Sequence, residues 1–384
     1  SDVCSSDLPT AASIPIKKRS SGSTKRSTPD SQSRLGAHRS RSANILTKSP
    51  RMSVAAPGSV NNDKYELRIT VAAQQQLTTF HKGLVWDFSY SEDGKYCVTA
   101  GKNGLVMVWE ICNGLVVKTP VTTFNQHTGE VLSVEFIDGM RVCSTSSNNE
   151  VFIWNALNGE KQAAIEVTDT CMCCTYCADN KRLVLGLLDG TITAYDTVKF
   201  ERLQSYEVHA PITAVDCVSS EEEGTTYMLG TINGTVYVLY DYDDRMQLVK
   251  TTSLKDPCII TSIIINKKEH ICYVTCSNSK ILVYTTHELG MVARYKGVVT
   301  NCMAIRPSLS QDTTLLYVAS KDGGVFFFPN SPPPIRKSTD LTGQKVTMFA
   351  GEGKRVIHVS QIPNSNNLLV IDEDGGAAVF NIKL

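Results

Sequence analysis

The chain has 384 residues, of which 42% are hydrophobic and 20% charged, and its formal net charge is zero. That length suits one large all-β domain. No run of about 18 apolar residues occurs, so no membrane span is predicted, and the first residues lack the apolar stretch of a secretory signal. Thirteen cysteines lie mostly in predicted strands. Buried free thiols of this kind predict a reduced, intracellular protein, cytoplasmic or nuclear.

The charges are distributed unevenly along the chain. Residues 1–63 carry ten Lys or Arg and four Asp, a net charge of +6, whereas the remaining residues carry 28 basic and 34 acidic side chains, a net charge of −6. Residues 1–63 are rich in Ser, Thr and Pro without apolar periodicity, which predicts a disordered basic tail. Residues 1–8 lack an initiator Met and are interpreted as a sequencing or assembly artefact.

The tail contains two short basic clusters, formed by Lys17, Lys18, Arg19, Lys25 and Arg26. Clusters of this type act as nuclear import signals, or contact nucleic acid, acidic microtubule surfaces or anionic lipid. The alternative is a solvated linker that binds nothing. The sequence leaves these readings open.

A unit of three short strands occupies Phe80–Glu110, with Asp93-Gly94 and Asn103-Gly104 supplying the positive φ angles that tight turns need. Six further copies are found when the chain is aligned on the second turn of this unit. The seven turns are Asn103-Gly104, Asn148-Asn149, Asp189-Gly190, Asn233-Gly234, Asn278-Ser279, Asp322-Gly323 and Asp374-Gly375. The strand after each turn ends in a large apolar residue, namely Trp109, Trp154, Tyr195, Leu239, Tyr284, Phe328 and Phe380.

The first unit resembles a WD40 repeat, with a His before its first strand (His81), a turn at Ser91–Gly94 and a closing Trp109-Glu110. The resemblance implies an all-β fold, a seven-bladed WD40-like β-propeller over residues 64–384. The last unit ends after its third strand. Tyr65–Val71 alternates apolar and polar residues, so it is expected to be the outer strand of the last blade and to close the ring.

The family's repeat also implies a hydrogen-bond network from the His through a strand Ser or Thr to the Trp, oriented by an Asp in the turn. The His is expected at His81, His127 and His209. The Asp positions of the first three units hold Lys102, Ser147 and Leu188. The complete network is therefore expected in none of the blades, which would be held mainly by apolar burial.

Four cysteines, Cys171, Cys173, Cys174 and Cys177, include the two-residue spacing of zinc sites. Zinc needs four convergent ligands, but alternate residues of a strand face opposite sides of a sheet. These residues are therefore predicted to be core cysteines, with no metal. Phosphate-binding loops, a nucleophile elbow and a His-Glu-x-x-His motif are absent. We expect no enzyme activity, no cofactor and no small-molecule substrate.

A proline-rich stretch, Ser331–Arg336, either docks in an aromatic groove of a partner or stiffens an exposed turn.

In WD40 proteins the second residue of each inner strand faces the narrow end of the channel, where partners dock. Those positions are Trp86, Leu132, Met172, Thr213, Thr261, Thr300 and Ile357. The apolar members Trp86, Leu132, Met172 and Ile357 are predicted to bind a peptide or helix of a partner protein. The alternative is that they pack against one another.

The expected function is that of a non-catalytic protein–protein interaction scaffold with partners on the top face of the propeller. One alternative is a nucleic-acid or ribonucleoprotein-associated factor that uses the basic arm. Another is a cytoskeletal or ciliary structural propeller. Because propellers support many unrelated roles, the fold alone does not choose between these functions.

Overall fold

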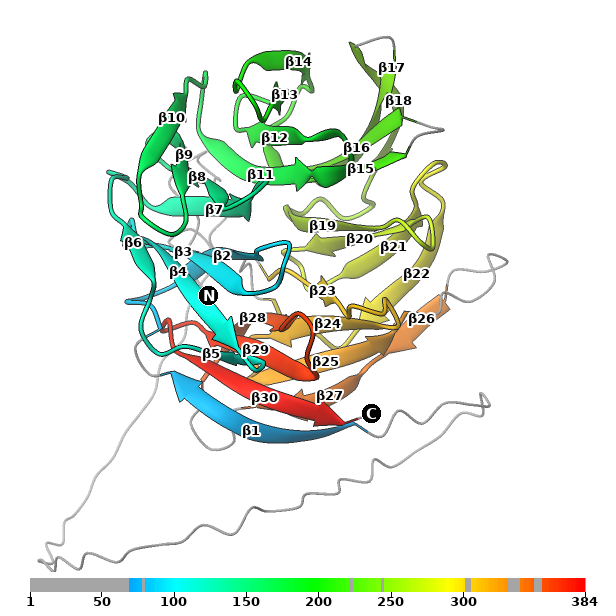
Figure 1. The fold of residues 1–384 in the computed structure, drawn as a ribbon. Coiled ribbons are helices and arrows are strands. Elements are labelled where there is room, and N and C mark those ends of the chain that lie inside the picture. The colour runs from blue at the N-terminus through cyan, green and yellow to red at the C-terminus, as the bar shows by residue number, and fades with distance from the viewer. Residues whose placement is uncertain are drawn as a thin grey trace, which may run out of the picture. The chain divides into compact units, whose positions relative to one another are not determined.

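The computed structural model describes residues 69–77, 80–220, 224–242, 245–300, 305–330, 339–348 and 354–383. These residues form seven β-sheets arranged as the blades of a ring (Figure 1). The innermost strands surround a central channel. The predicted all-β, seven-bladed WD40-like propeller is therefore confirmed. Within the described part of the chain, no helix is long and apolar enough to cross a membrane.

The first four blades are built from consecutive antiparallel strands. Blade 1 contains β2 (Val85–Tyr90), β3 (Tyr96–Gly101) and β4 (Val106–Cys112), with β5 (Leu115–Val116) and β6 (Thr122–Phe124) both on β4. Blade 2 contains β7 (Val131–Phe136), β8 (Arg141–Ser146), β9 (Val151–Asn155) and β10 (Lys161–Ile165). Blade 3 contains β11 (Cys171–Cys177), the 3-10 helix η1 (Ala178–Asn180), β12 (Arg182–Leu187), β13 (Thr191–Asp196) and β14 (Arg202–Glu207). Blade 4 contains β15 (Ile212–Ser220), β16 (Gly224–Thr231), β17 (Thr235–Tyr242) and β18 (Arg245–Ser253).

The last three blades depart from this simple order. Blade 5 contains β19 (Ile260–Asn266), β20 (Ile271–Cys276), β21 (Ile281–Thr285) and β22 (Met291–Lys296), and β26 (Thr339–Thr342) adds a fifth strand. Blade 6 contains β23 (Ser308–Leu309), β24 (Leu315–Ser320), β25 (Gly324–Pro329) and β27 (Gln344–Thr347). Blade 7 contains β28 (Val356–Gln361), β29 (Asn367–Asp372), β30 (Ala377–Lys383) and β1 (Thr70–Leu77).

The seven predicted turns all join the second and third strands of a blade. The second residue of each turn has a positive φ, a conformation that glycine adopts readily and that Asn tolerates better than most residues. The values are 76° at Gly104, 61° at Asn149, 89° at Gly190, 80° at Gly234, 65° at Ser279, 85° at Gly323 and 83° at Gly375. The turn pattern therefore placed every blade correctly.

Strand β1 closes the ring. It pairs antiparallel with β30, from Thr70 opposite Lys383 to Leu77 opposite Ala377, so the two ends of the described chain complete one blade. The prediction of closure by an N-terminal strand is confirmed in kind, but its position was wrong. The strand is Thr70–Leu77 rather than Tyr65–Val71, and residues 65–68 lie outside the described residues. Five of its eight residues are exposed, so it lacks the alternation that sequence reasoning sought.

The core lies between neighbouring blades. Five clusters of buried apolar side chains fill these spaces. Trp109 stacks on Phe80 with ring centroids 4.4 Å apart, and Trp154 stacks on Phe124 at 4.7 Å. All seven predicted strand-end residues are buried. Each blade therefore depends on its neighbours to cover its apolar faces.

A parallel strand joins blades 5 and 6 at the outer edge of the ring. Strand β26 pairs in parallel with β22, the outer strand of blade 5, with Ala293 opposite Thr339 and Lys296 opposite Thr342. After Gly343 the chain continues as β27, which pairs with β25 of blade 6. Lys296 and Asp340 form an ion pair at 2.5 Å across the β22–β26 junction. The outer edge of β22 is therefore occupied by the chain itself.

Candidate functional site

The entrance of the channel is built from one backbone hydrogen bond repeated in every blade. In each blade, the residue after the second strand donates its N–H to a backbone carbonyl ahead of the inner strand, at 2.9 or 3.0 Å. The acceptor is the residue directly before the inner strand in every blade except blade 6, where Val299 lies further ahead of β23. We call these fourteen residues the entrance rim. The donor and acceptor pairs are Lys102 and Leu84, Ser147 and Glu130, Leu188 and Thr170, Ile232 and Pro211, Ser277 and Ile259, Lys321 and Val299, and Glu373 and Arg355.

The entrance rim is charged on one side. Blade 7 contributes Arg355 and Glu373, whose side chains are 3.2 Å apart. Blades 1 and 2 contribute Lys102 and Glu130, whose charged groups are 4.0 Å apart. Exposed pairs of this kind contribute little stability because water screens them. This side of the rim is therefore a hydrated surface with both signs of charge.

The opposite side of the entrance rim is apolar. Leu188 of blade 3, Pro211 of blade 4 and Ile259 of blade 5 are half-buried, and Ile232 of blade 4 is 38% exposed. Met172, the second residue of β11, is also half-buried. We call these five residues the apolar arc. Sequence reasoning found Met172 and missed the other four, although their fixed spacing from the positive-φ turns would have identified them.

The four predicted top-face residues each occupy a β-bulge in an inner strand. The pairing register skips Trp86, Leu132, Met172 and Ile357. A bulge turns one side chain away from the regular alternation of the strand. Trp86 is 7%, Leu132 6% and Ile357 2% exposed, so these three lie beneath the rim while Met172 reaches it. The indole N–H of Trp86 donates to Glu130 Oε2 at 3.1 Å and links blades 1 and 2.

The predicted position in blade 6 was wrong by one residue. Lys321 donates its N–H to Val299, just as Lys102 does to Leu84, so Thr300 corresponds to Val85 rather than to Trp86. The burial agrees, since Thr300 is fully buried and Val85 is 1% exposed. The true counterpart of Trp86 is residue 301, which lies outside the described residues.

The His–Ser–Trp network is complete in blade 2, contrary to expectation. Ser144 Oγ lies 2.7 Å from His127 Nε2 and accepts a hydrogen bond from Trp154 Nε1 at 3.1 Å. Glu150 Oε2 lies 3.4 Å from His127 Nδ1 and takes the place of the family's Asp. Burial lowers the pKa of His127 to about 4 despite this carboxylate. The expectation failed because the acid follows the turn instead of lying within it.

The other predicted histidines differ from His127. In blade 1, Trp109 Nε1 donates to Thr99 Oγ1 at 3.0 Å, while His81 is buried and neither of its ring nitrogens has a partner among the described residues. His209 is exposed, so it forms no buried network in blade 4. The His–Ser–Trp network therefore differs among blades 1, 2 and 4.

The cysteine cluster of β11 divides between two interfaces, as strand alternation predicts. Cys171 and Cys174 pack with blade 2, whereas Cys173 packs with blade 4. Cys177 is also buried. Burial raises the pKa of the Cys171 and Cys173 thiols. Among the residues that the structure describes, no group of three or more His, Cys, Asp or Glu is arranged to hold a metal ion.

Charged side chains line the channel below the rim. Asp87, Glu135, Asp216 and Arg306 border a cavity of about 310 Å³. Burial raises the pKa of Asp216 to about 6, although the N–H groups of Ile265 and Cys217 donate to its carboxylate. Burial also raises the pKa of Glu135, and the nearby carboxylates of Asp87 and Asp216 add to that shift. Sequence reasoning gave these residues no role, because the three acids each lie in an apolar inner strand and Arg306 lies just before β23.

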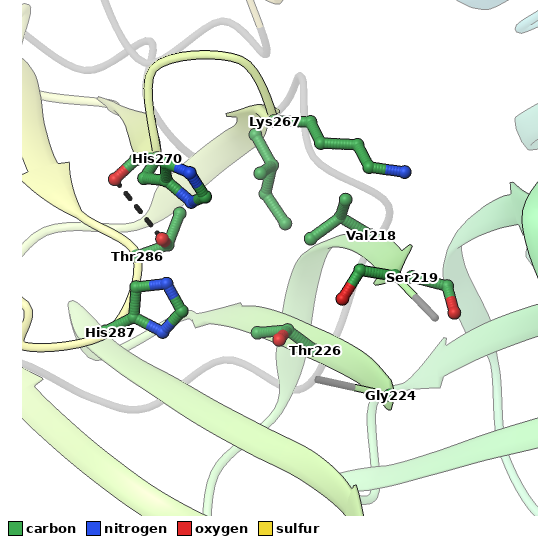
Figure 2. A pocket seen from close by; sticks show the side chains of 10 residues that line it. Val218, Ser219, Gly224, Thr226, Lys267, His270, Thr286 and His287 are labelled. Carbon is green, nitrogen blue, oxygen red and sulfur yellow. Dashed lines mark hydrogen bonds between the residues drawn. The ribbon is translucent and has the colours of Figure 1, made fainter. Parts of the chain in front are cut away.

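A second, smaller cavity lies between blades 4 and 5 (Figure 2). It has a volume of about 70 Å³, enough for a few water molecules. Thr286 Oγ1 donates to the carbonyl of His270 at 3.2 Å, and His287 Nδ1 lies 2.7 Å from the hydroxyl of Tyr240. The rings of His270 and His287 are 5.7 Å apart.

The remaining sequence predictions fall outside the described residues. The basic-arm residues Lys17, Lys18, Arg19, Lys25 and Arg26 belong to this group, as does the stretch Ser331–Arg336. The boundary between residues 63 and 64, and the artefact assigned to residues 1–8, also lie there. All of these stay predictions.

Comparison with known proteins places the chain in a class. The family model described as WD domain, G-beta repeat, matches residues 74–110 and 118–155. These two segments include β2, β3 and most of β4 of blade 1 and β7, β8 and β9 of blade 2, with Trp109 and Trp154. The matched repeats and the seven-bladed ring together identify a WD40-repeat β-propeller.

Several curated proteins are distantly similar. The chain is 20% identical over 323 residues to WD repeat-containing protein 44 of Xenopus laevis, covering 66% of this chain and 34% of that protein. It is 19% identical over 304 residues to the WD repeat-containing protein 26 homolog of Arabidopsis thaliana, covering 78% and 49%. It is 21% identical over 258 residues to the Intraflagellar transport protein 122 homolog of Danio rerio, covering 65% and 20%. The chain thus spans less than half the length of each of these relatives.

Proposed function

We propose that this propeller is a non-catalytic scaffold that binds a peptide or helix of a partner protein across the entrance rim. The observation that carries the proposal is the apolar arc, a row of partly exposed apolar side chains on three adjoining blades. Apolar residues grouped in this way are typical of protein interfaces. WD40 propellers are generally protein-interaction scaffolds rather than enzymes, which agrees with this assignment.

The four predicted residues take different parts in this proposal. Met172 belongs to the apolar arc and contacts the partner directly. Trp86, Leu132 and Ile357 are buried beneath the rim, where they hold the neighbouring loops in place. Trp86 does so through its hydrogen bond to Glu130. Trp86→Ala should therefore weaken binding less than a change in the arc itself.

The test compares partner recovery by the full chain carrying one of two substitutions. Ile232→Asp puts a charge in the apolar arc. Val198→Asp is the matched control, because Val198 is 72% exposed and follows β13, at the end of the blade opposite the rim. Affinity purification followed by quantitative mass spectrometry should lose partners with Ile232→Asp and keep them with Val198→Asp, while thermal unfolding stays the same. Equal recovery with both variants would exclude the rim as the docking surface.

The intracellular location is part of the same proposal. All eleven cysteines that the structure describes are free thiols, and the five in blades 2 and 3, Cys143, Cys171, Cys173, Cys174 and Cys177, are all buried. Free thiols in this number suit a reducing compartment. Mass measurement of the protein from cells after rapid alkylation should show them reduced.

The ciliary alternative has one supporting observation, the 21% identity to a protein named for intraflagellar transport. At that identity the likeness concerns the fold and leaves the assembly open. The nucleic-acid alternative depends on the basic arm, which lies outside the described residues. Both stay secondary to the scaffold proposal.

A further inference from the structure

A groove in blade 3 adjoins the apolar arc. It has a volume of about 410 Å³ and extends from Asp189, next to Leu188 of the arc, along strand β14 to Glu207. Glu166, from the loop that leads into blade 3, lines it as well. These three carboxylates share the groove with one guanidinium, that of Arg202. The lining therefore carries a net charge of −2 when its acids are ionised.

The carboxylates remain available to a ligand. Asp189 already accepts hydrogen bonds from Thr168 Oγ1 at 2.5 Å and Thr191 N at 2.8 Å. Burial acts to raise the pKa of Asp189, but these hydrogen bonds outweigh it and lower the pKa, so the group is charged at neutral pH. Glu166 and Glu207 are exposed, and neither carboxylate has a hydrogen bond or ion pair within the described ranges.

Two tyrosines complete the walls of the groove. Tyr195 of β13 is 7% exposed, and Tyr206 of β14 is half-buried. Aromatic faces attract ammonium and guanidinium groups, and carboxylates bind the same groups through charge-assisted hydrogen bonds. A groove that combines both favours a cationic side chain. Its position beside Leu188 lets one peptide reach the groove and the apolar arc together.

We infer that the partner segment carries a Lys or Arg side chain in the blade 3 groove, followed by apolar residues that lie on the apolar arc. This inference rests on the proposed function, because it specifies the partner for the same rim. The negative charge of the groove favours a partner segment that is positively charged. An acidic segment would be repelled, and a neutral apolar segment would leave the carboxylates without a partner.

The probes are three pools of fluorescent dodecapeptides. All pools share apolar residues at the same positions, and their remaining positions hold Lys and Arg, Glu and Asp, or Ser and Gln. Fluorescence anisotropy with the full chain at low salt should show the basic pool binding about tenfold more tightly than the neutral pool, with the acidic pool weakest. The advantage should shrink as salt is added, because exposed charges are screened.

The variants separate this inference from the proposal on which it rests. Glu166→Gln with Glu207→Gln should remove most of the advantage of the basic pool, by about three- to tenfold, while Glu160→Gln, at an exposed site on the neighbouring blade, should leave it unchanged. If Ile232→Asp abolishes binding but the three pools bind equally, the rim docks partners and the groove does not select charge. Binding that survives Ile232→Asp, or no binding by any pool, would overturn both.

Discussion

Asp87 in blade 1 and Arg306 in blade 6 meet inside the channel, with Oδ1 and Nη1 2.5 Å apart. The Asp87 side chain is 3% exposed and that of Arg306 is 27% exposed. Asp87 also accepts hydrogen bonds from Ser133 Oγ at 2.7 Å and from the backbone N–H of Val134 at 3.0 Å. One buried carboxylate therefore connects blades 1, 2 and 6.

Arg306→Met should lower the free energy of unfolding by about 3 kcal/mol, because it leaves a buried carboxylate without its cation. The partial exposure of Arg306 reduces this effect below that of a fully buried pair. Urea unfolding followed by tryptophan fluorescence measures the change. Lys267→Met is the control, since Lys267 and its partner Asp179 are both 56% exposed, and it should cost less than about 1 kcal/mol. Equal losses for the two variants would contradict the structural role of the channel pair.

Gln75 fastens the closing strand to the first blade. Its Nε2 donates to the carbonyl of Val116 at 2.6 Å, and its Oε1 accepts from the N–H of Val116 at 3.1 Å. Gln75→Ala should cost about 2 kcal/mol, the sum of two hydrogen bonds of about 1 kcal/mol each. Gln76→Ala is the control, because the next side chain along the strand is exposed, and it should leave the free energy of unfolding nearly unchanged. Thermal unfolding of both variants decides whether the ring closes through this contact.

Gly375 and Gly83 offer a matched pair of glycines with positive φ, 83° and 90°. A Cβ on Gly375 would lie 2.3 Å from the carbonyl oxygen of Gly83, whereas a Cβ on Gly83 would meet nothing within 4 Å. Gly83→Ala should cost about 1 kcal/mol for its backbone conformation. Gly375→Ala should cost about 2 kcal/mol more, because backbone must move. Similar unfolding temperatures for the two variants would show that the contact between blades 7 and 1 is looser than described.

Acidification should destabilise the propeller through its buried histidines. Burial lowers the pKa of His81, His127 and His358 to about 4 in the folded state. In the unfolded chain a histidine binds a proton near pH 6.5. Between pH 6.5 and 4 the unfolded state is therefore protonated at each of these positions while the folded state is not. Each histidine then lowers the free energy of unfolding by up to about 1.4 kcal/mol for every unit by which the pH falls. Asp216 acts in the opposite direction, because its pKa is raised to about 6 and acidification favours the folded state through it.

The contribution of one histidine is isolated by comparing His127→Asn with the unsubstituted chain. The slope of the unfolding free energy against pH reports how many more protons the unfolded state binds than the folded state. Between pH 6.5 and 4.5 this number should be smaller by nearly one in the variant. His209→Asn, which changes an exposed ring, should leave the slope unchanged. An unaltered slope in His127→Asn would mean that His127 is accessible to protons in the folded protein.

The parts of this fold that sequence could predict are those set by local backbone geometry. The seven turns were found because Gly and Asn adopt a positive φ most readily, and they hold the second turn position in six of the seven blades. The bulges of the inner strands were not predicted. Long-range choices were not readable in the same way. The closing strand is selected by its pairing with β30, and Arg306 is 219 residues from Asp87. Glu150 was missed because a side chain can reach His127 from more than one position in a turn.

The candidate site shows the same division. Trp86 and Leu132 were recognised as apolar side chains at the channel mouth, but their burial depends on the loops above them. Leu188 was noticed only as the residue at an expected Asp position, and Ile232 was not noticed, since single apolar residues beside a turn are common. Tyr195 was predicted only as a buried strand end, and its place beside Glu166 and Glu207 depends on how blade 3 packs against the loop before it.

The passage of the chain from β26 to β27 changes how the ring can open. In a ring of separate blades, one blade can detach by losing contacts with its two neighbours alone. Here blade 6 cannot leave without also stripping a strand from blade 5, since only Gly343 separates the two pairings. Blades 5 and 6 should therefore exchange their amide hydrogens as one cooperative unit, and the first local opening of the ring should occur elsewhere.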